Sequence, residues 1–300
     1  MSITYTERRT VYGQLTNDSS TANLDFGDRL MNEEEKRVIN SRAWDFTQRL
    51  HTTLTVANQQ FYNLPVNYRK MIGQATITVG SIVYTVPMAP DRQAWDRLNS
   101  VSTTSDIPQW AYLFNNQIGF YPKPSTAGNT ISLPYELQAI DMSVADFTTG
   151  TILSVAAAAT TVEGTGSPTW TAGMAGKYLR INDDNSATSG DNQWYEIASV
   201  TDTDTLVLSI PYEGTAIASA TQSYTIAQLS ILPNGYDMLP VYKAAEQFYI
   251  KEIDAAKTDR FAKLHKELFT TLTRDRGSKT SDLVIGENVS VKNPNIYLRQ

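Results

Sequence analysis

The sequence contains no cysteine and only two histidines among its 300 residues. The absence of cysteine excludes disulfides, zinc–thiolate sites, iron–sulfur clusters and a cysteine nucleophile. No Gly-x-Ser-x-Gly motif occurs, so His51 and His265 belong to no recognisable hydrolase triad, and we expect both to have structural or surface roles. We therefore predict no catalytic residue, no cofactor and no enzymatic activity.

Long hydrophobic runs are also missing. The longest apolar run, Val155 to Ala159, is mostly alanine and far too short to span a bilayer. The N-terminus carries Glu7, Arg8 and Arg9 and lacks the apolar core of a secretion signal. We expect a soluble protein with no membrane partner and no export signal.

Basic residues are scarce in the middle of the chain. Residues 143–229 contain two basic and nine acidic side chains, a net charge of −7, whereas the remainder of the chain carries +1. A sharp change at both edges of one block marks a separate unit. We predict a discontinuous domain of residues 1–142 and 230–300, interrupted by an acidic domain of residues 143–229. Neither part is basic enough for a tight nucleic-acid binder.

The flanking regions mix helical and strand periodicities. Residues 1–24 are polar without a sustained period and are interpreted as an extended arm, whereas residues 24–46 show a thin helical stripe. Two hairpins are predicted, at 72–86 with Gly80 in the turn and at 110–121 with Asn115-Asn116 in the turn. Strand alternation is also present at 50–56 and 131–137, and a short helix follows Asp91. Helix returns at Tyr236, breaks near Thr258-Asp259 and stops at Gly277.

The acidic block is rich in Thr, Ala, Ser and Gly and shows only strand patterns. The predicted strands are 151–155, 178–181, 194–200, 205–209 and 223–226. This pattern predicts a small antiparallel barrel or sandwich. The fold class is therefore α+β, with helices and antiparallel hairpins in a core that an all-β insertion interrupts. Gly164-Thr165-Gly166 lacks the Lys and the helix of a phosphate-binding loop and is interpreted as a β-turn.

One acidic loop has the hard oxygen ligands that calcium prefers, namely Asp183, Asp184 and Asp191. The spacing does not match an EF-hand loop, and no bidentate Glu ends it. A plain turn is the more usual interpretation of such a run, so no metal is assigned.

Several segments, taken in order, resemble the head-to-tail adaptor (neck or connector) proteins of tailed bacteriophages. They are Ala43-Trp44-Asp45-Phe46, Gln60-Phe61-Tyr62-Asn63-Leu64-Pro65, Pro108-Gln109-Trp110-Ala111-Tyr112, the hairpin strand that ends in Tyr121-Pro122-Lys123-Pro124, and Leu239-Pro240 at the start of the C-terminal helices. The acidic block is similar to β modules inserted in phage structural proteins.

The resemblance implies a structural virion protein at the head–tail junction, assembled in the host cytoplasm. It implies a homo-oligomeric ring with the twelvefold symmetry of the portal, joining head to tail and lining the DNA conduit. The implied partners are further copies of the chain, the portal protein, the next neck or tail protein, and double-stranded DNA that passes without sequence-specific binding.

The C-terminal arm, residues 278–300, is the predicted partner-binding segment, because an extended arm can add to a neighbouring sheet edge. Its candidate contact residues are Leu283, Val284, Ile285, Val289, Val291, Ile296, Tyr297 and Leu298. Two other functions stay open. Residues 143–229 can carry recognition in a receptor- or carbohydrate-binding virion protein, and a tail-associated hydrolase is the third class.

Overall fold

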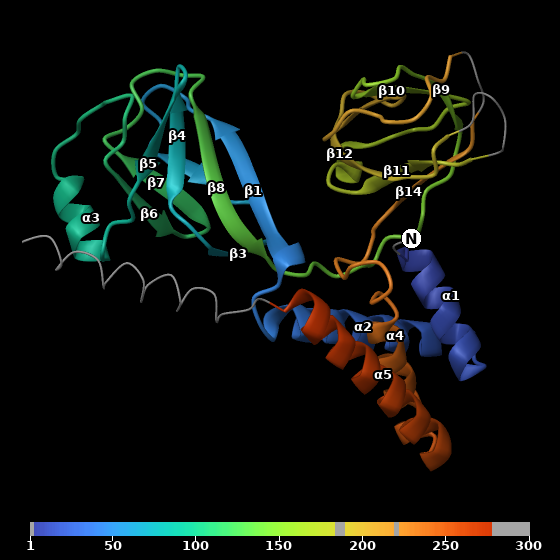
Figure 1. Cartoon of the computed structure of the whole chain (residues 1–300). Coiled ribbons are helices and arrows are strands. Elements are labelled where there is room, and N and C mark those ends of the chain that lie inside the picture. Colours follow the sequence, from blue (N-terminus) through green and yellow to red (C-terminus); the bar gives the residue numbers. More distant parts are fainter. Residues whose placement is uncertain (1–2, 184–189, 219–221, 278–300) are drawn as a thin grey trace, which may run out of the picture. The chain divides into compact units, whose positions relative to one another are not determined.

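The computed structural model describes residues 3–183, 190–218 and 222–277 (Figure 1). The helices are α1 (Tyr5–Thr16), α2 (Thr21–Asn40), α3 (Arg92–Leu98), α4 (Leu239–Lys251) and α5 (Ala255–Arg276). The strands are β1 (Gln48–Leu54), β2 (Phe61–Asn63), β3 (Tyr68–Met71), β4 (Ala75–Val79), β5 (Ile82–Val86), β6 (Trp110–Phe114), β7 (Gln117–Tyr121), β8 (Thr130–Leu137), β9 (Thr151–Val155), β10 (Thr161–Thr165), β11 (Tyr178–Ile181), β12 (Trp194–Val200), β13 (Thr205–Leu208) and β14 (Tyr224–Ala227). This is the predicted α+β class with a β-rich insertion.

The chain folds as two compact units. Unit 1 comprises Met1–Glu35 and Asp141–Thr271, and unit 2 comprises Lys36–Ile140 and Leu272–Gln300. The predicted separation of residues 143–229 from a discontinuous core of 1–142 and 230–300 stays a prediction.

The interpretation of residues 1–24 as an extended arm was wrong, because α1 and the start of α2 together occupy most of that segment. Thr4 accepts a hydrogen bond from the Glu7 N–H, and the Glu7 carboxylate accepts one from the Thr4 N–H, which together form a capping box. The sequence of α1 shows no apolar stripe, because one of the residues on its buried side is an arginine, Arg8. Tyr12 is fully buried against Met31 of α2 and Val241 of α4.

Helix α2 spans Thr21–Asn40, so it both begins and ends earlier than the helix predicted at 24–46. The Val38 carbonyl accepts from both Ser41 N–H and the indole Nε1 of the buried Trp44, and this contact turns the chain out of the helix. The last carbonyls, of Ile39 and Asn40, accept hydrogen bonds from Arg69 at 3.2 and 3.3 Å. The terminal carbonyls of α2 are thus satisfied by side chains outside the helix.

The break between the C-terminal helices lies at residues 252–254, earlier than the predicted Thr258-Asp259. Asp254 begins α5, since its carboxylate accepts from the Lys257 N–H at 3.0 Å and its carbonyl from the Thr258 N–H. Ile253, at the corner, has φ of 59° and is 91 % exposed. The apolar periodicity runs through the corner, so it did not reveal the cap.

The insertion forms a six-stranded sheet in the order β14-β11-β12-β13-β10-β9. Bridges from Ile152 to Gln222 and from Val155 to Ile217 join β9 to the residues that precede β14, so the sheet curls back on itself. The five predicted strands are confirmed within a residue or so. β10 was missed because its Gly164 was assigned to a turn, and a bulge between Glu163 and Gly164 accommodates that glycine.

Unit 2 contains two sheets around one core. The larger has the order β1-β8-β4-β5 with β3 also paired to β8, and the smaller has the order β2-β7-β6. Both predicted hairpins are confirmed, with Gly80 at φ 61° and Asn115 and Asn116 at φ 47° and 60°. The core between the sheets includes Ile77, Ile118, Phe120, Ile131 and Leu133.

Strand β1 is confirmed, yet its apolar residues face away from that core. Leu50 is 64 % exposed and Leu54 is 59 % exposed, and Val56 just beyond the strand is 51 % exposed. The half-buried side of β1 holds His51 and Thr53 instead. An exposed row of aliphatic side chains on one strand is therefore a feature of unit 2.

Candidate functional site

An ion pair is buried where α1 packs against α2 in unit 1. The guanidinium Nη1 of Arg8 donates to Glu35 Oε2 at 2.8 Å, and Nη2 donates to Asn32 Oδ1 at 2.7 Å. The side-chain exposures of Arg8 and Glu35 are 0 % and 3 %. The second carboxylate oxygen of Glu35 accepts from Ser230 Oγ and from the Ile231 N–H, each at 2.8 Å. The pair is thus hydrogen-bonded on both sides, as a buried pair requires.

The same network holds the two segments that lead into and out of the inserted sheet. Asn32 donates to the Met142 carbonyl at 3.0 Å and accepts from the Met142 N–H at 3.2 Å. The Gln228 side-chain oxygen accepts from the N–H groups of Ser143 and Val144, at 2.8 and 2.9 Å. The entering segment is therefore bound to α2 and to the leaving segment.

The start of α1 also hydrogen-bonds to both of these segments. Thr4 Oγ1 donates to Asp146 Oδ2 at 2.7 Å, and the Asp146 N–H donates to Thr6 Oγ1 at 3.0 Å. The Tyr5 N–H donates to the Gln228 carbonyl at 3.2 Å. We call the set Thr4, Arg8, Asn32, Glu35, Met142, Asp146, Gln228 and Ser230 the junction.

The chemistry of the junction is structural. Most of its donors and acceptors bond to one another, whereas Arg8 Nε and Asp146 Oδ1 are buried without a hydrogen-bond partner among the described residues. The network of bonds fixes the geometry of the junction. Close by, the Asp237 carboxylate accepts from the Ile3 N–H at 2.9 Å, and burial raises the pKa of Asp237. Burial likewise raises the pKa of Asp28, although Tyr5 and Arg9 hydrogen-bond to it and act in the opposite direction.

The two histidines occupy different units. His265 of α5 places Nε2 2.8 Å from Glu34 Oε1 of α2 in a buried contact, and its ring stacks near Phe269. His51 lies on β1, where burial lowers its pKa. His265 thus joins α5 to α2, and His51 is a half-buried residue of β1.

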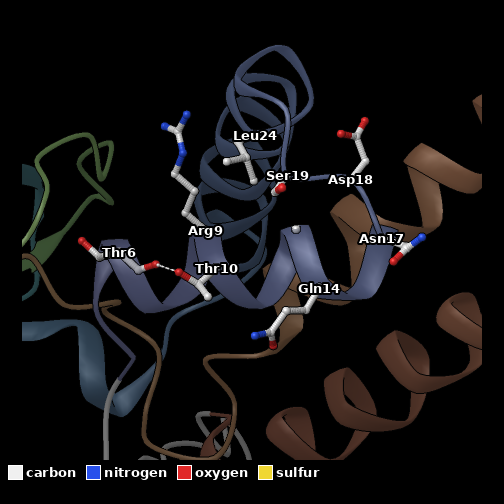
Figure 2. Close-up of a pocket in the computed structure, with 9 residues that line it drawn as sticks. Thr6, Arg9, Thr10, Gln14, Asn17, Asp18, Ser19 and Leu24 are labelled. Atoms are coloured by element: carbon white, nitrogen blue, oxygen red, sulfur yellow. Dashed lines mark hydrogen bonds between the residues drawn. The ribbon is translucent and has the colours of Figure 1, made fainter.

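A surface depression of about 430 Å³ lies along α1 and the start of α2 (Figure 2). Its lining residues are Thr6, Arg9, Thr10, Gly13, Gln14, Asn17, Asp18, Ser19 and Leu24. Arg9 pairs with Asp25 and Asp28 at 2.6 Å, and Thr10 donates back to the Thr6 carbonyl, as the dashed line in Figure 2 shows. Among its lining side chains, Arg9 and Thr10 are already bonded within α1 and α2, and Thr6 Oγ1 accepts from the Asp146 N–H.

The calcium candidates are separated in their roles. Asp191 accepts from the Tyr195 hydroxyl and from the Gln193 N–H, so its carboxylate organises its own turn. Asp183 is exposed, and Asp184 lies outside the described residues. In the described part of the chain no group of three His, Cys, Asp or Glu side chains is placed to hold a metal ion. The predicted partner-binding residues Leu283 to Leu298 also lie outside the described residues.

Sequence reasoning did not find the junction. The Thr4-x-x-Glu7 capping box was a readable signal for the start of α1. The burial of Arg8 had no such signal, because its partners Asn32 and Glu35 lie far away in sequence, as does Ser230, which bonds to Glu35. Among the described residues, no helix is both long and apolar enough to cross a membrane.

These features define an α+β protein in which a curled β insertion is fastened to a helical layer by a buried polar junction. A family model described as SU10 adaptor protein matches residues 3–160, more than half of the chain, and the chain belongs to this family. The match begins ahead of α1 and ends just before β10 begins at Thr161. No curated protein matches the chain. The predicted resemblance to phage adaptors is confirmed at this level: the protein is a phage structural adaptor, a virion component that interacts with other head or tail proteins.

Proposed function

We propose that this adaptor forms a closed ring between the portal and the tail, joins head to tail, and lines the passage through which DNA moves. Its partners are copies of itself in a ring that matches the portal symmetry, the portal protein above, and the next neck or tail protein below. The observation that carries the proposal is the adaptor family match over residues 3–160.

A ring forms when one face of a subunit complements a different face of its neighbour and the rotation closes. Such a subunit needs a rigid body and at least two distinct adhesive surfaces. The junction supplies rigidity within unit 1, because α1, α2 and both linkers share one hydrogen-bonded network. The exposed residues Leu50, Leu54 and Val56 of unit 2 supply an apolar surface.

The charge distribution supports a conduit that DNA crosses without being held. A surface that neutralises many phosphates binds DNA strongly, and such binding would hinder the passage of DNA through the ring. Outside residues 143–229 the net charge is +1, so that part can line the passage. Residues 143–229 carry −7, and we place them on the outside of the ring, where they meet water and not phosphate.

In this proposal the protein works by binding and not by catalysis. Residues 278–300 dock on a partner during assembly, and the entropy lost on ordering them is offset only when that partner is present. The assembly is therefore sequential in the proposal, with each docking step creating the surface for the next.

Electron microscopy of the purified protein and of virions tests the ring. The expected result is closed rings of this chain, located in virions between portal and tail. A chain lacking residues 278–300 should stay folded, judged by its melting curve, but fail to dock. Its control replaces these residues with a Gly/Ser segment of equal length, which should fail equally. A stable monomer placed away from the head–tail junction overturns the proposal.

A further inference from the structure

Strand β1 is an open edge of the larger sheet in unit 2. It pairs with β8 alone, and no strand of the described residues lies on its other side. The opposite edge differs, because the chain that follows β5 continues hydrogen bonding: the Ala111 N–H donates to the Pro87 carbonyl, and the Ala89 N–H donates to the Ala111 carbonyl. The β5 edge is thus continued by β6 just beyond Val86, although β5 itself pairs only with β4 among the described strands.

The hydrogen-bond pattern of β1 shows which of its backbone N–H and C=O groups point away from β8. The Thr55 N–H donates to the Asn129 carbonyl at 2.8 Å, and the Gly128 N–H donates to the Thr55 carbonyl at 2.9 Å. Odd-numbered residues thus face β8, since pairing alternates along an antiparallel strand. Leu50, Thr52 and Leu54 consequently turn their N–H and C=O groups away from the sheet.

The side chains of these residues make the edge adhesive. No charged side chain stands among Leu50, Thr52 and Leu54, and all three are exposed. In register with them across the sheet lie residues that are also uncharged: Pro134, Ser132, Thr130, Thr76, Thr78, Val83 and Thr85. Natural edge strands are usually protected by charge, proline or a bulge. The one charged residue of β1, Arg49, alternates to the other face of the strand and donates back to the Phe46 and Gln48 carbonyls. The face with Leu50, Thr52 and Leu54 therefore lacks such protection.

Residues 278–300 have the composition of a covering strand. Leu283, Ile285, Val289 and Val291 all occupy odd-numbered positions, a parity that puts them on one face of a strand, with Glu287 between the two pairs. At about 3.3 Å per residue, an extended segment of this length reaches roughly 75 Å, far enough to leave its own subunit.

The last described residue before this segment is already paired. Gly277 makes an antiparallel bridge to Trp44, so the described chain runs there opposite to the residues that lead into β1. Pairing of β1 with β1 of a second copy would be two-fold and would close as a dimer. We propose that residues 278–300 of one copy add as a strand to the β1 edge of the next copy in the ring, an inference that rests on the proposed ring.

Cross-linking in the cysteine-free chain tests this docking directly. One protein carries Thr52→Cys, and a second, tagged protein carries a cysteine at Ile285, Val289 or Val291. The two are mixed under the conditions in which rings are seen by electron microscopy and then oxidised. The matched control is Thr85→Cys, the same residue type in the same cross-strand row (Thr52–Ser132–Thr76–Thr85) on the opposite edge.

The expected result is a disulfide-linked heterodimer with Thr52→Cys and none with Thr85→Cys. Leu54→Lys should also abolish rings, whereas Val83→Lys, in the row of Leu54 at the opposite edge, should leave them intact. Four outcomes overturn the inference while the proposed function stands. They are rings that form without the Thr52 cross-link, linkage within one chain that carries both cysteines, Thr52–Thr52 dimers, and linkage to Thr85→Cys. Absence of rings from both purified protein and virions overturns the proposed function itself.

Discussion

Glu35→Gln is the substitution that tests the junction most directly. Glu35 accepts three hydrogen bonds, from Arg8, Ser230 and the Ile231 N–H. A glutamine has one oxygen and one NH₂ group in place of the two carboxylate oxygens. If the glutamine oxygen still accepts the hydrogen bonds from Ser230 and the Ile231 N–H, its NH₂ group faces the Arg8 guanidinium. Two donors then lie opposite each other with no acceptor between them.

The magnitude follows from the burial of the pair. Arg8 and Glu35 have side-chain exposures of 0 % and 3 %, so the substitution leaves a buried positive charge without its counter-charge. Breaking a buried pair in this way costs about 3–5 kcal/mol. The double substitution Arg8→Met with Glu35→Leu removes both charges and should cost less than Glu35→Gln alone, because no unpaired charge is left behind.

Urea unfolding followed by far-UV circular dichroism measures these differences. The control is Asp96→Asn, which breaks an exposed pair of α3 in which Arg92 and Asp96 are 52 % and 55 % exposed. It should cost no more than about 0.5 kcal/mol. A Glu35→Gln protein within about 1 kcal/mol of the original, or a double variant less stable than the single one, would refute the reasoning.

Three further substitutions have expected outcomes. Thr4→Ala removes the cap of α1 and should cost about 1 kcal/mol in thermal or urea unfolding, whereas Thr10→Ala, on the exposed side of the same helix, should stay within about 0.5 kcal/mol. Ile253→Gly should stabilise the protein by about 1 kcal/mol, since a left-handed β-branched residue is strained and this one is exposed; Ile253→Ala keeps the Cβ and should gain less. Burial lowers the pKa of His51 below its usual 6.5, so on acidification the unfolded chain binds this proton at a higher pH than the folded chain does. Stability should therefore fall as pH decreases below about 6.5, and His51→Gln should flatten that dependence in a pH series of melts.

Local patterns were sufficient for most of the strands. The turn residues Gly80, Asn115 and Asn116 adopt positive φ angles that favour Gly and Asn, so both hairpins could be placed from the sequence. In the insertion, alternation and turn clusters located five strands. The exception was β10, where Gly164 interrupts the pattern at a bulge.

Long-range contacts were beyond sequence reasoning. Arg8 reads as a surface charge, and only Glu35, brought alongside by the packing of α1 on α2, makes its burial possible. The end of α2 depends in the same way on Arg69, which bonds the Ile39 and Asn40 carbonyls from a distant strand. The alternation of β1 predicted a strand, but an alternating pattern does not by itself tell which face lies against the core.

The linkers of the insertion suggest how it can be removed without losing the junction. Phe147 and Ile226 exchange two backbone hydrogen bonds at 2.8 Å, so they are a directly opposed pair in an antiparallel ladder. Replacing residues 148–225 by Asn-Gly would close this pair with a two-residue hairpin turn. That variant keeps Met142, Asp146 and Gln228, and the helices of unit 1 should stay folded. Excision of 143–229 instead removes the bonds to Thr4, Thr6 and Tyr5, and its helical melting temperature should be lower. Equal melting temperatures for the two excisions would mean that the bonds of Asp146 and Gln228 to α1 contribute nothing to the stability of the helical layer.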